Sequence, residues 1–75
     1  MKELSEFIKR LTELEYEAVS LEVIFGDADS ARLIDLEDIL SSIEKIGIKE
    51  VSDIYTESFE FYSNNGTYMS INAVY

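Results

Sequence analysis

Two stretches of the chain repeat apolar residues at helical spacing. In the first, the apolar residues have the i, i+3, i+4, i+7 spacing of one helix face. They are Leu4, Phe7, Ile8, Leu11 and Leu14. Charged residues occupy the positions between them. The pattern predicts a helix over residues 2–15 with one buried stripe.

The second helical stretch lies between residues 31 and 46. Viewed down a helix axis, its apolar residues would fall within an arc of about 140°. They are Leu33, Leu36, Ile39, Leu40, Ile43 and Ile46. Gly47 follows where a left-handed C-cap belongs. Its start is open: Ser30 or Asp29 caps a helix over 31–46, or Asp35 caps a shorter one and residues 31–34 form a short strand. We favour the long helix because Leu33 fits the apolar arc.

Residues 16–25 have an apolar period of two. One side carries Val19, Leu21, Val23 and Phe25, and the other carries Ser20 and Glu22. This alternation predicts a half-buried strand that ends at Gly26.

Residues 50–75 predict a β-hairpin whose register depends on its turn. A two-residue Asn65-Gly66 turn would place Phe61 opposite Ser70 and mix the two faces. A three-residue loop over 64–66, with Gly66 left-handed, instead places Phe61 opposite Met69. Burial of one face fixes register strongly, so we expect the three-residue loop.

That register predicts both faces of the hairpin. The apolar face pairs Phe59 with Ile71 and Tyr55 with Tyr75. The outer face pairs Tyr62 with Tyr68, Glu60 with Ser70, Ser58 with Asn72 and Thr56 with Val74. We therefore expect a tyrosine pair beside a carboxylate on the solvent side.

These elements predict one α+β domain over residues 1–75. Their order is helix–strand–helix–strand–strand, or helix–strand–strand–helix–strand–strand if residues 31–34 form a strand. Two helices on one face of a small antiparallel sheet bury the apolar stripes, and the other sheet face remains open to solvent.

The charge balance narrows the possible partners. Sixteen acidic and six basic residues give a net charge of −10, and no Lys or Arg follows Lys49. Phosphate contact requires cations, so direct binding to nucleic acid or to an anionic membrane is disfavoured. A field of this sign favours basic protein partners. The chain has no cysteine and no stretch long enough to span a membrane, which fits a cytoplasmic protein.

The residue types also limit the chemistry. Without His or Cys, neither a nucleophilic triad nor a structural zinc site is expected, so we predict no enzyme and no cofactor. Residues 27–38 suggest a calcium loop, with Asp27, Asp29 and Asp38 at its first, third and twelfth positions. However, Ala31 replaces a ligand and Arg32 replaces the required glycine. We therefore predict no metal site.

The acidic residues are the candidate binding residues. Carboxylates spaced along a rigid element can replace the phosphates of a duplex and compete for its Lys and Arg partners. Exposed tyrosines beside them supply anchors for an interface. The candidate partner-binding residues are Glu22, Glu37, Asp38, Glu44, Asp53, Glu57, Glu60, Tyr62 and Tyr68.

In element order the chain resembles small acidic inhibitors that phages direct against host nucleic-acid enzymes. These are the anti-CRISPR, antirestriction and uracil-DNA glycosylase inhibitor proteins. The stretches that carry the resemblance are "ELSEFIKRL", "VSLEVIF", "LEDILSSIEKIG" and "SDIYTESFEFYSNNGTYMSINA". The resemblance to the glycosylase inhibitors implies that Glu22, Glu37 and Asp38 mimic DNA phosphates. It also implies an apolar pocket between helix and sheet that captures a side chain of the enzyme.

The leading hypothesis is a phage-encoded inhibitor that covers the basic nucleic-acid surface of a host defence or repair enzyme in the host cytoplasm. One alternative is an immunity protein or antitoxin that neutralises a basic toxin nuclease. Another is an interaction module that dimerises through the tyrosine-bearing hairpin. Both a monomer and a homodimer are compatible with the sequence.

Overall fold

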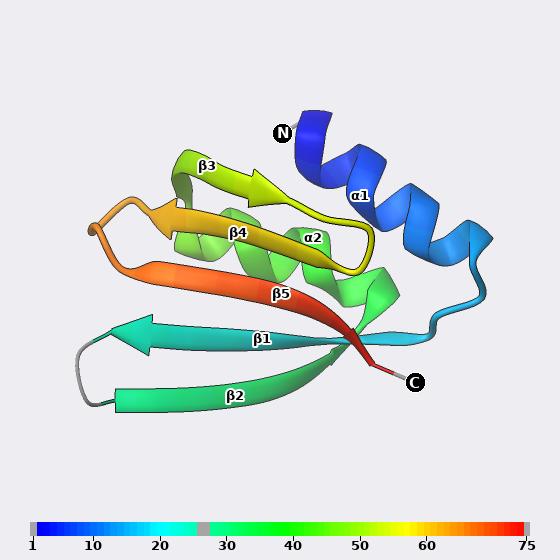
Figure 1. The fold of residues 1–75 in the computed structure, drawn as a ribbon, viewed down its shortest axis with the longest axis horizontal. Helices are drawn as coiled ribbons and strands as arrows, with labels where there is room; N and C mark the ends of the chain where they lie inside the picture. The colour runs from blue at the N-terminus through cyan, green and yellow to red at the C-terminus, as the bar shows by residue number, and fades with distance from the viewer. Residues whose placement is uncertain (1, 26–27, 75) are drawn as a thin grey trace.

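The structure, a computed structural model, describes residues 2–25 and 28–74. Within them the elements are α1 (Lys2–Glu13), β1 (Ala18–Phe25), β2 (Ala28–Asp35), α2 (Leu36–Ile46), β3 (Ile48–Ile54), β4 (Ser58–Ser63) and β5 (Tyr68–Val74). The strands form one antiparallel sheet in the order β2-β1-β5-β4-β3 (Figure 1). The predicted α+β class with two helices and an antiparallel sheet is confirmed.

The first helix forms because its apolar stripe is buried. Leu4, Phe7, Ile8 and Leu11 all lie in the core. The prediction was wrong at the end of this helix, which stops at Glu13, and Leu14 is 52% exposed. Glu15 takes a positive φ of 67°, which turns the chain out of the helix before it enters β1.

The first strand has the predicted alternation. Val19 and Leu21 are buried, whereas Ser20 and Glu22 lie on the other face of the sheet. Gly26, which was expected to end this strand, lies outside the described residues.

The long second helix was the wrong choice. Residues 28–35 form the edge strand β2, paired along its whole length with β1, and Asp35 takes the N-cap position of α2. Ile34, which does not fit the helical arc, pairs with Val19 and is buried like it. Leu33 is 66% exposed on the opposite face. Strand pairing therefore prevails over a helical period that Leu33 fitted by coincidence.

The prediction that residues 50–75 form one hairpin was also wrong. The chain reverses twice, because the N–H of Tyr55 donates to the carbonyl of Ser58 at 2.7 Å and closes a turn between β3 and β4. Tyr55 and Thr56 therefore lie in a loop, so Thr56 does not pair with Val74. The expected partner of Tyr55, Tyr75, lies outside the described residues.

The register of the β4–β5 hairpin is as predicted. Phe61 faces Met69, and Tyr62 faces Tyr68. Gly66 has a φ of 86°, and the N–H of Ser63 donates to the carbonyl of Thr67 at 2.9 Å. The three-residue loop is therefore confirmed.

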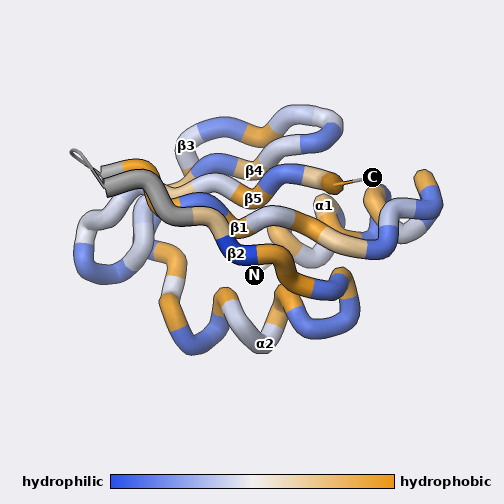
Figure 2. Tube along the Cα trace, turned by 90° about the horizontal axis from the view of Figure 1, so that it is seen from below, coloured by the Kyte–Doolittle hydropathy of each residue, from blue (hydrophilic) through white to orange (hydrophobic). Residues whose placement is uncertain are grey.

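The core lies between the helices and one face of the sheet. Phe59 is fully buried, with its ring centroid 5.4 Å from that of Phe7 on α1 and 6.1 Å from that of Phe61. From α2, Ile39 and Ile43 join the same cluster. Figure 2 shows α2 as a separate layer below the strands. No element of residues 2–25 and 28–74 covers the opposite face of the sheet (Figure 1).

The end of α2 is joined to the β4–β5 turn. Gly47 takes φ 80° and ψ 135°, and its N–H donates to the carbonyl of Ile43 at 2.8 Å. The carbonyl of Gly47 accepts a hydrogen bond of 3.1 Å from the N–H of Asn64. A Cβ added at Gly47 would lie 2.0 Å from the side-chain nitrogen of Asn64, so this junction requires glycine.

Across the described residues, neither helix is long and apolar enough to cross a membrane.

Candidate protein-binding face

The face of the sheet opposite the helices, called here the open sheet face, is built by the alternation of four strands. On β1, β4 and β5 each residue on it is the neighbour of a core residue in the chain, because successive side chains point to opposite faces. Glu50 and Asp53 of β3 belong to it because they pair with Tyr62 and Glu60. Its polar and aromatic members are Ser20, Glu22, Glu50, Asp53, Ser58, Glu60, Tyr62, Tyr68, Ser70 and Asn72.

One row across this face is acidic. Register aligns Glu22 of β1, Ser70 of β5, Glu60 of β4 and Asp53 of β3. The Ser70 hydroxyl lies 3.5 Å from a carboxylate oxygen of Glu22. Strands lie about 4.8 Å apart, so the backbones that carry Glu22 and Glu60 are separated by about 10 Å. Asp53 and Glu60 oppose each other directly, an arrangement of like charges that is unfavourable in a sheet.

The next row is aromatic. It contains Tyr68, Tyr62 and Glu50, on β5, β4 and β3. The rings of Tyr62 and Tyr68 are 5.2 Å apart between centroids and nearly perpendicular at 78°. Tyr62 is 38% exposed. The expected tyrosine pair beside Glu60 is therefore present.

The environment of Tyr68 favours its neutral form. Burial raises its pKa to about 12, helped by the hydrogen bond of its hydroxyl to Glu60 and by the negative charges of Glu60 and Asp53. The Tyr68 hydroxyl donates this hydrogen bond to the Glu60 carboxylate, which stabilises the protonated phenol and holds the ring in place.

This pKa predicts how stability depends on alkaline pH. The folded-state pKa exceeds the ordinary value of about 10, so the contribution of Tyr68 is complete below pH ~10 and is lost as pH rises towards 12. The free energy of unfolding should therefore fall more steeply across this interval in the wild type than in Tyr68→Phe. Urea denaturation at a series of pH values measures the difference. Parallel curves for the two proteins would contradict the assignment.

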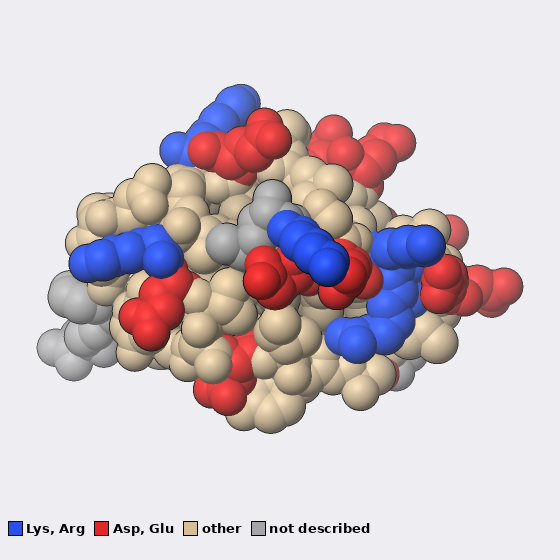
Figure 3. Space-filling model, turned by 90° about the horizontal axis from the view of Figure 1, so that it is seen from above, with Lys and Arg blue, Asp and Glu red and all other residues tan. Residues whose placement is uncertain are grey.

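Three of the four strands that build this face carry no basic residue. Strands β1, β4 and β5 contain no Lys or Arg, and Arg32 of β2 shares the register of the buried Leu21. Figure 3 views the side of α1 and β3, where Lys and Arg lie among Asp and Glu. The carboxylates of Glu22 and Glu60 therefore lie on strands without a basic residue, whereas β3 carries Lys49 next to Glu50.

The remaining predicted binding residues lie elsewhere. Glu37 and Asp38 are exposed on the first turn of α2, with carboxylate oxygens within 4.8 Å of one another and of Asp35. Glu57 lies in the β3–β4 loop and accepts a 2.5 Å hydrogen bond from the hydroxyl of Tyr16. The nine predicted residues therefore divide between the open sheet face, α2 and this loop.

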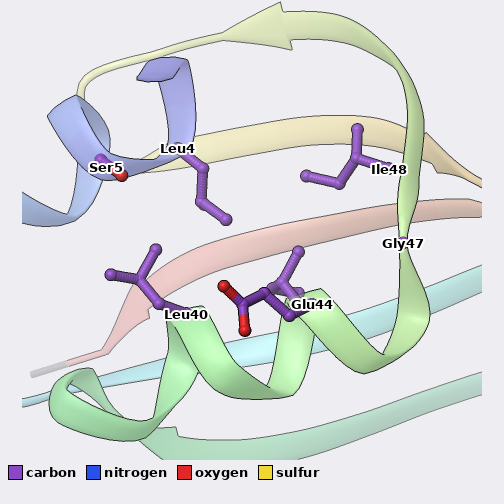
Figure 4. A pocket seen from close by; sticks show the side chains of 7 residues that line it. Leu4, Ser5, Leu40, Glu44, Gly47 and Ile48 are labelled. Carbon is purple, nitrogen blue, oxygen red and sulfur yellow. The ribbon is translucent and has the colours of Figure 1, made fainter. Parts of the chain in front are cut away.

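Glu44 borders an apolar hollow between α1, α2 and the start of β3. The hollow has a volume of about 250 Å³, and Leu4, Leu40 and Ile48 point into it (Figure 4). Leu40 is 38% exposed. This hollow and the open sheet face lie on opposite sides of the sheet.

Glu50 was missed by the sequence reasoning. It faces Tyr62 because β3 is a strand of its own. Register shifts between Ile48 and Glu50 and between Val51 and Asp53 break the period of two that would have revealed the strand. The apolar residues Ile48, Val51 and Ile54, at spacings of three, were the available signal.

Comparisons with protein-family models, with curated proteins and with solved structures found no match to this chain. The candidate site therefore depends on the geometry described above.

Proposed function

We propose that this protein is an inhibitor, of the kind that phages encode, which binds the basic nucleic-acid surface of a host defence or repair enzyme through its open sheet face. The observation that carries the proposal is the set of four carboxylates beside the tyrosine pair, on strands of which β1, β4 and β5 contain no Lys or Arg. Those carboxylates belong to Glu22, Glu50, Asp53 and Glu60.

The physical basis is competition for cations. A channel that holds nucleic acid presents Arg and Lys side chains, which form charge-assisted hydrogen bonds to carboxylates as well as to phosphates. The sheet fixes the spacing of the carboxylates, so little conformational entropy is lost when they bind. The net charge of −10 accelerates encounter with a basic surface.

Two further features support the proposal. Glu37 and Asp38 add negative charge at the positive end of α2, where the resemblance places phosphate mimics. The hollow beside Leu40 offers a place for an apolar side chain of the enzyme, as the same resemblance implies. Because these features lie on the helical side of the sheet, an enzyme that used all of them would have to surround the domain.

The test begins by identifying the enzyme and then measures competition. The immobilised chain captures host proteins at about 0.05 M salt, and mass spectrometry identifies those released at about 0.5 M. With the purified enzyme, the chain should displace nucleic acid, and its association rate constant should fall about tenfold or more over the same salt range.

A matched pair of variants locates the surface. Glu22→Gln with Glu60→Gln removes two charges from the open sheet face, whereas Glu3→Gln with Glu13→Gln removes two exposed charges from α1. The first variant should weaken binding about tenfold or more, and the second should change it little. Salt-insensitive binding, or a complex that still holds its nucleic acid, would refute the mimicry. A toxin nuclease encoded beside this chain as the captured partner would instead favour an immunity function.

A further inference from the structure

We propose that the open sheet face contains a subsite for one arginine side chain of the partner, stacked on Tyr62 between Glu50 and Glu60. This inference rests on the proposed function and specifies the chemistry that the face recognises. It commits to a guanidinium group on a protein, rather than to a cation of any kind.

The position of Tyr62 supplies the geometry. Glu50 lies directly across from Tyr62 on β3, and Glu60 lies two residues away on the same strand and the same face. Such neighbours have backbones about 5 Å and about 7 Å away, respectively. A guanidinium group over the Tyr62 ring would therefore be within reach of two carboxylates.

Tyr68 holds the aromatic platform in place. Its hydroxyl donates to Glu60, and its ring meets that of Tyr62 nearly at right angles. A perpendicular pair covers one face of only one ring, so aromatic surface remains for a ligand. Tyr68 is thus a positioning residue, and Tyr62, which is 38% exposed, is the residue that would contact the ligand.

The charges on this face explain why a cation is favoured. Asp53 opposes Glu60 directly, and their negative charges contribute to raising the pKa of Tyr68. Like charges in opposed positions destabilise a sheet. A cation that binds between Glu50 and Glu60 relieves part of this repulsion, which adds to its affinity.

Arginine fits this environment better than lysine. Its planar guanidinium group stacks on an aromatic ring and can donate to two carboxylates at once. It is also more weakly hydrated than an ammonium group, so its transfer onto a half-buried platform costs less. The ring and the two carboxylates together therefore favour arginine over lysine. Negative charge alone would attract both side chains equally.

The experiment compares two peptides of equal length and charge, one rich in arginine and one rich in lysine, by calorimetric titration. We expect the wild-type chain to bind the arginine peptide about fivefold more tightly. Tyr62→Leu, which keeps an apolar side chain but removes the ring, should abolish this preference. Tyr55→Leu is the matched control, because Tyr55 is 55% exposed in the β3–β4 loop.

Asp53→Asn supplies a readout that structural damage would not give. The variant should raise the urea midpoint of unfolding, because it removes the repulsion with Glu60, and it should weaken binding of the arginine peptide several-fold. A damaged fold would instead lower the urea midpoint together with the affinity for the arginine peptide.

Equal affinity of the wild type for the two peptides would overturn the subsite, as would an equal loss of preference in Tyr62→Leu and Tyr55→Leu. These outcomes are separate from failure of the proposed function. If the enzyme loses nucleic acid to the chain while no arginine preference exists, only the subsite is refuted. If the preference exists but the bound enzyme retains its nucleic acid, only the mimicry is refuted.

Discussion

A Phe59→Ala variant is expected to lose about 3–5 kcal/mol of unfolding free energy, the largest loss among the substitutions described. Phe59 is fully buried, and its ring contacts the rings of Phe7 on α1 and Phe61 on the same strand. Truncation of a buried phenylalanine to alanine costs about 3–5 kcal/mol. Domains have roughly 0.05–0.15 kcal/mol of stability per residue, which is about 4–11 kcal/mol for 75 residues, so the substitution removes a large share of the total.

The loss should be visible in the circular dichroism spectrum and in urea denaturation. Phe59→Leu is the control, because it keeps most of the buried volume and should leave the chain folded. Tyr55→Ala, which removes an exposed aromatic ring, should change the urea midpoint little. A folded Phe59→Ala variant with wild-type stability would show that the core does not depend on contact between α1 and β4.

Gly47→Ala is expected to destabilise the fold by about 3 kcal/mol. The glycine has φ 80° and ψ 135°, a combination close to a region that is essentially restricted to glycine. The new Cβ would also meet the side-chain nitrogen of Asn64 at 2.0 Å, so the Asn64 side chain would have to move away from its position.

Gly66→Ala is the matched comparison. Gly66 has a similar φ of 86°, but a Cβ there would meet no atom within 4 Å. Its loss should therefore be limited to backbone strain, about 1 kcal/mol. Adding Asn64→Ala to Gly47→Ala should recover the steric part of the loss, which urea denaturation of both single variants and the double variant measures. Equal losses for Gly47→Ala and Gly66→Ala would exclude a specific role for the Asn64 contact.

The parts of the fold that the sequence predicted are those where burial decides between alternatives. A slip of one residue in the β4–β5 hairpin would have exposed Phe61, so its register could be inferred. At residues 31–34 burial did not decide, because Leu33 suited a helical arc while Ile34 suited a strand. The choice between helix and strand at these residues depends on their pairing with β1, and a local sequence pattern gives no information about that contact.

The candidate site followed the same division. The tyrosine pair and its neighbour Glu60 depend on the hairpin register alone, so they could be predicted. Glu50 could not, because bulges in β3 disguise the strand and the turn at 55–58 lacks glycine, proline, asparagine and aspartate. Nor could the sequence reveal that Glu44 and Glu22 lie on opposite sides of the sheet, since this depends on how the helices pack.

The strand order has a consequence for how the chain becomes a folded domain. β5 lies in the middle of the sheet, where it joins the β1–β2 pair to the β3–β4 pair, although it follows all the other strands in the chain. Without residues 68–74 the sheet would be two separate strand pairs with no strand to connect them. The acidic row from Glu22 to Asp53 therefore exists only when β5 is paired on both of its edges.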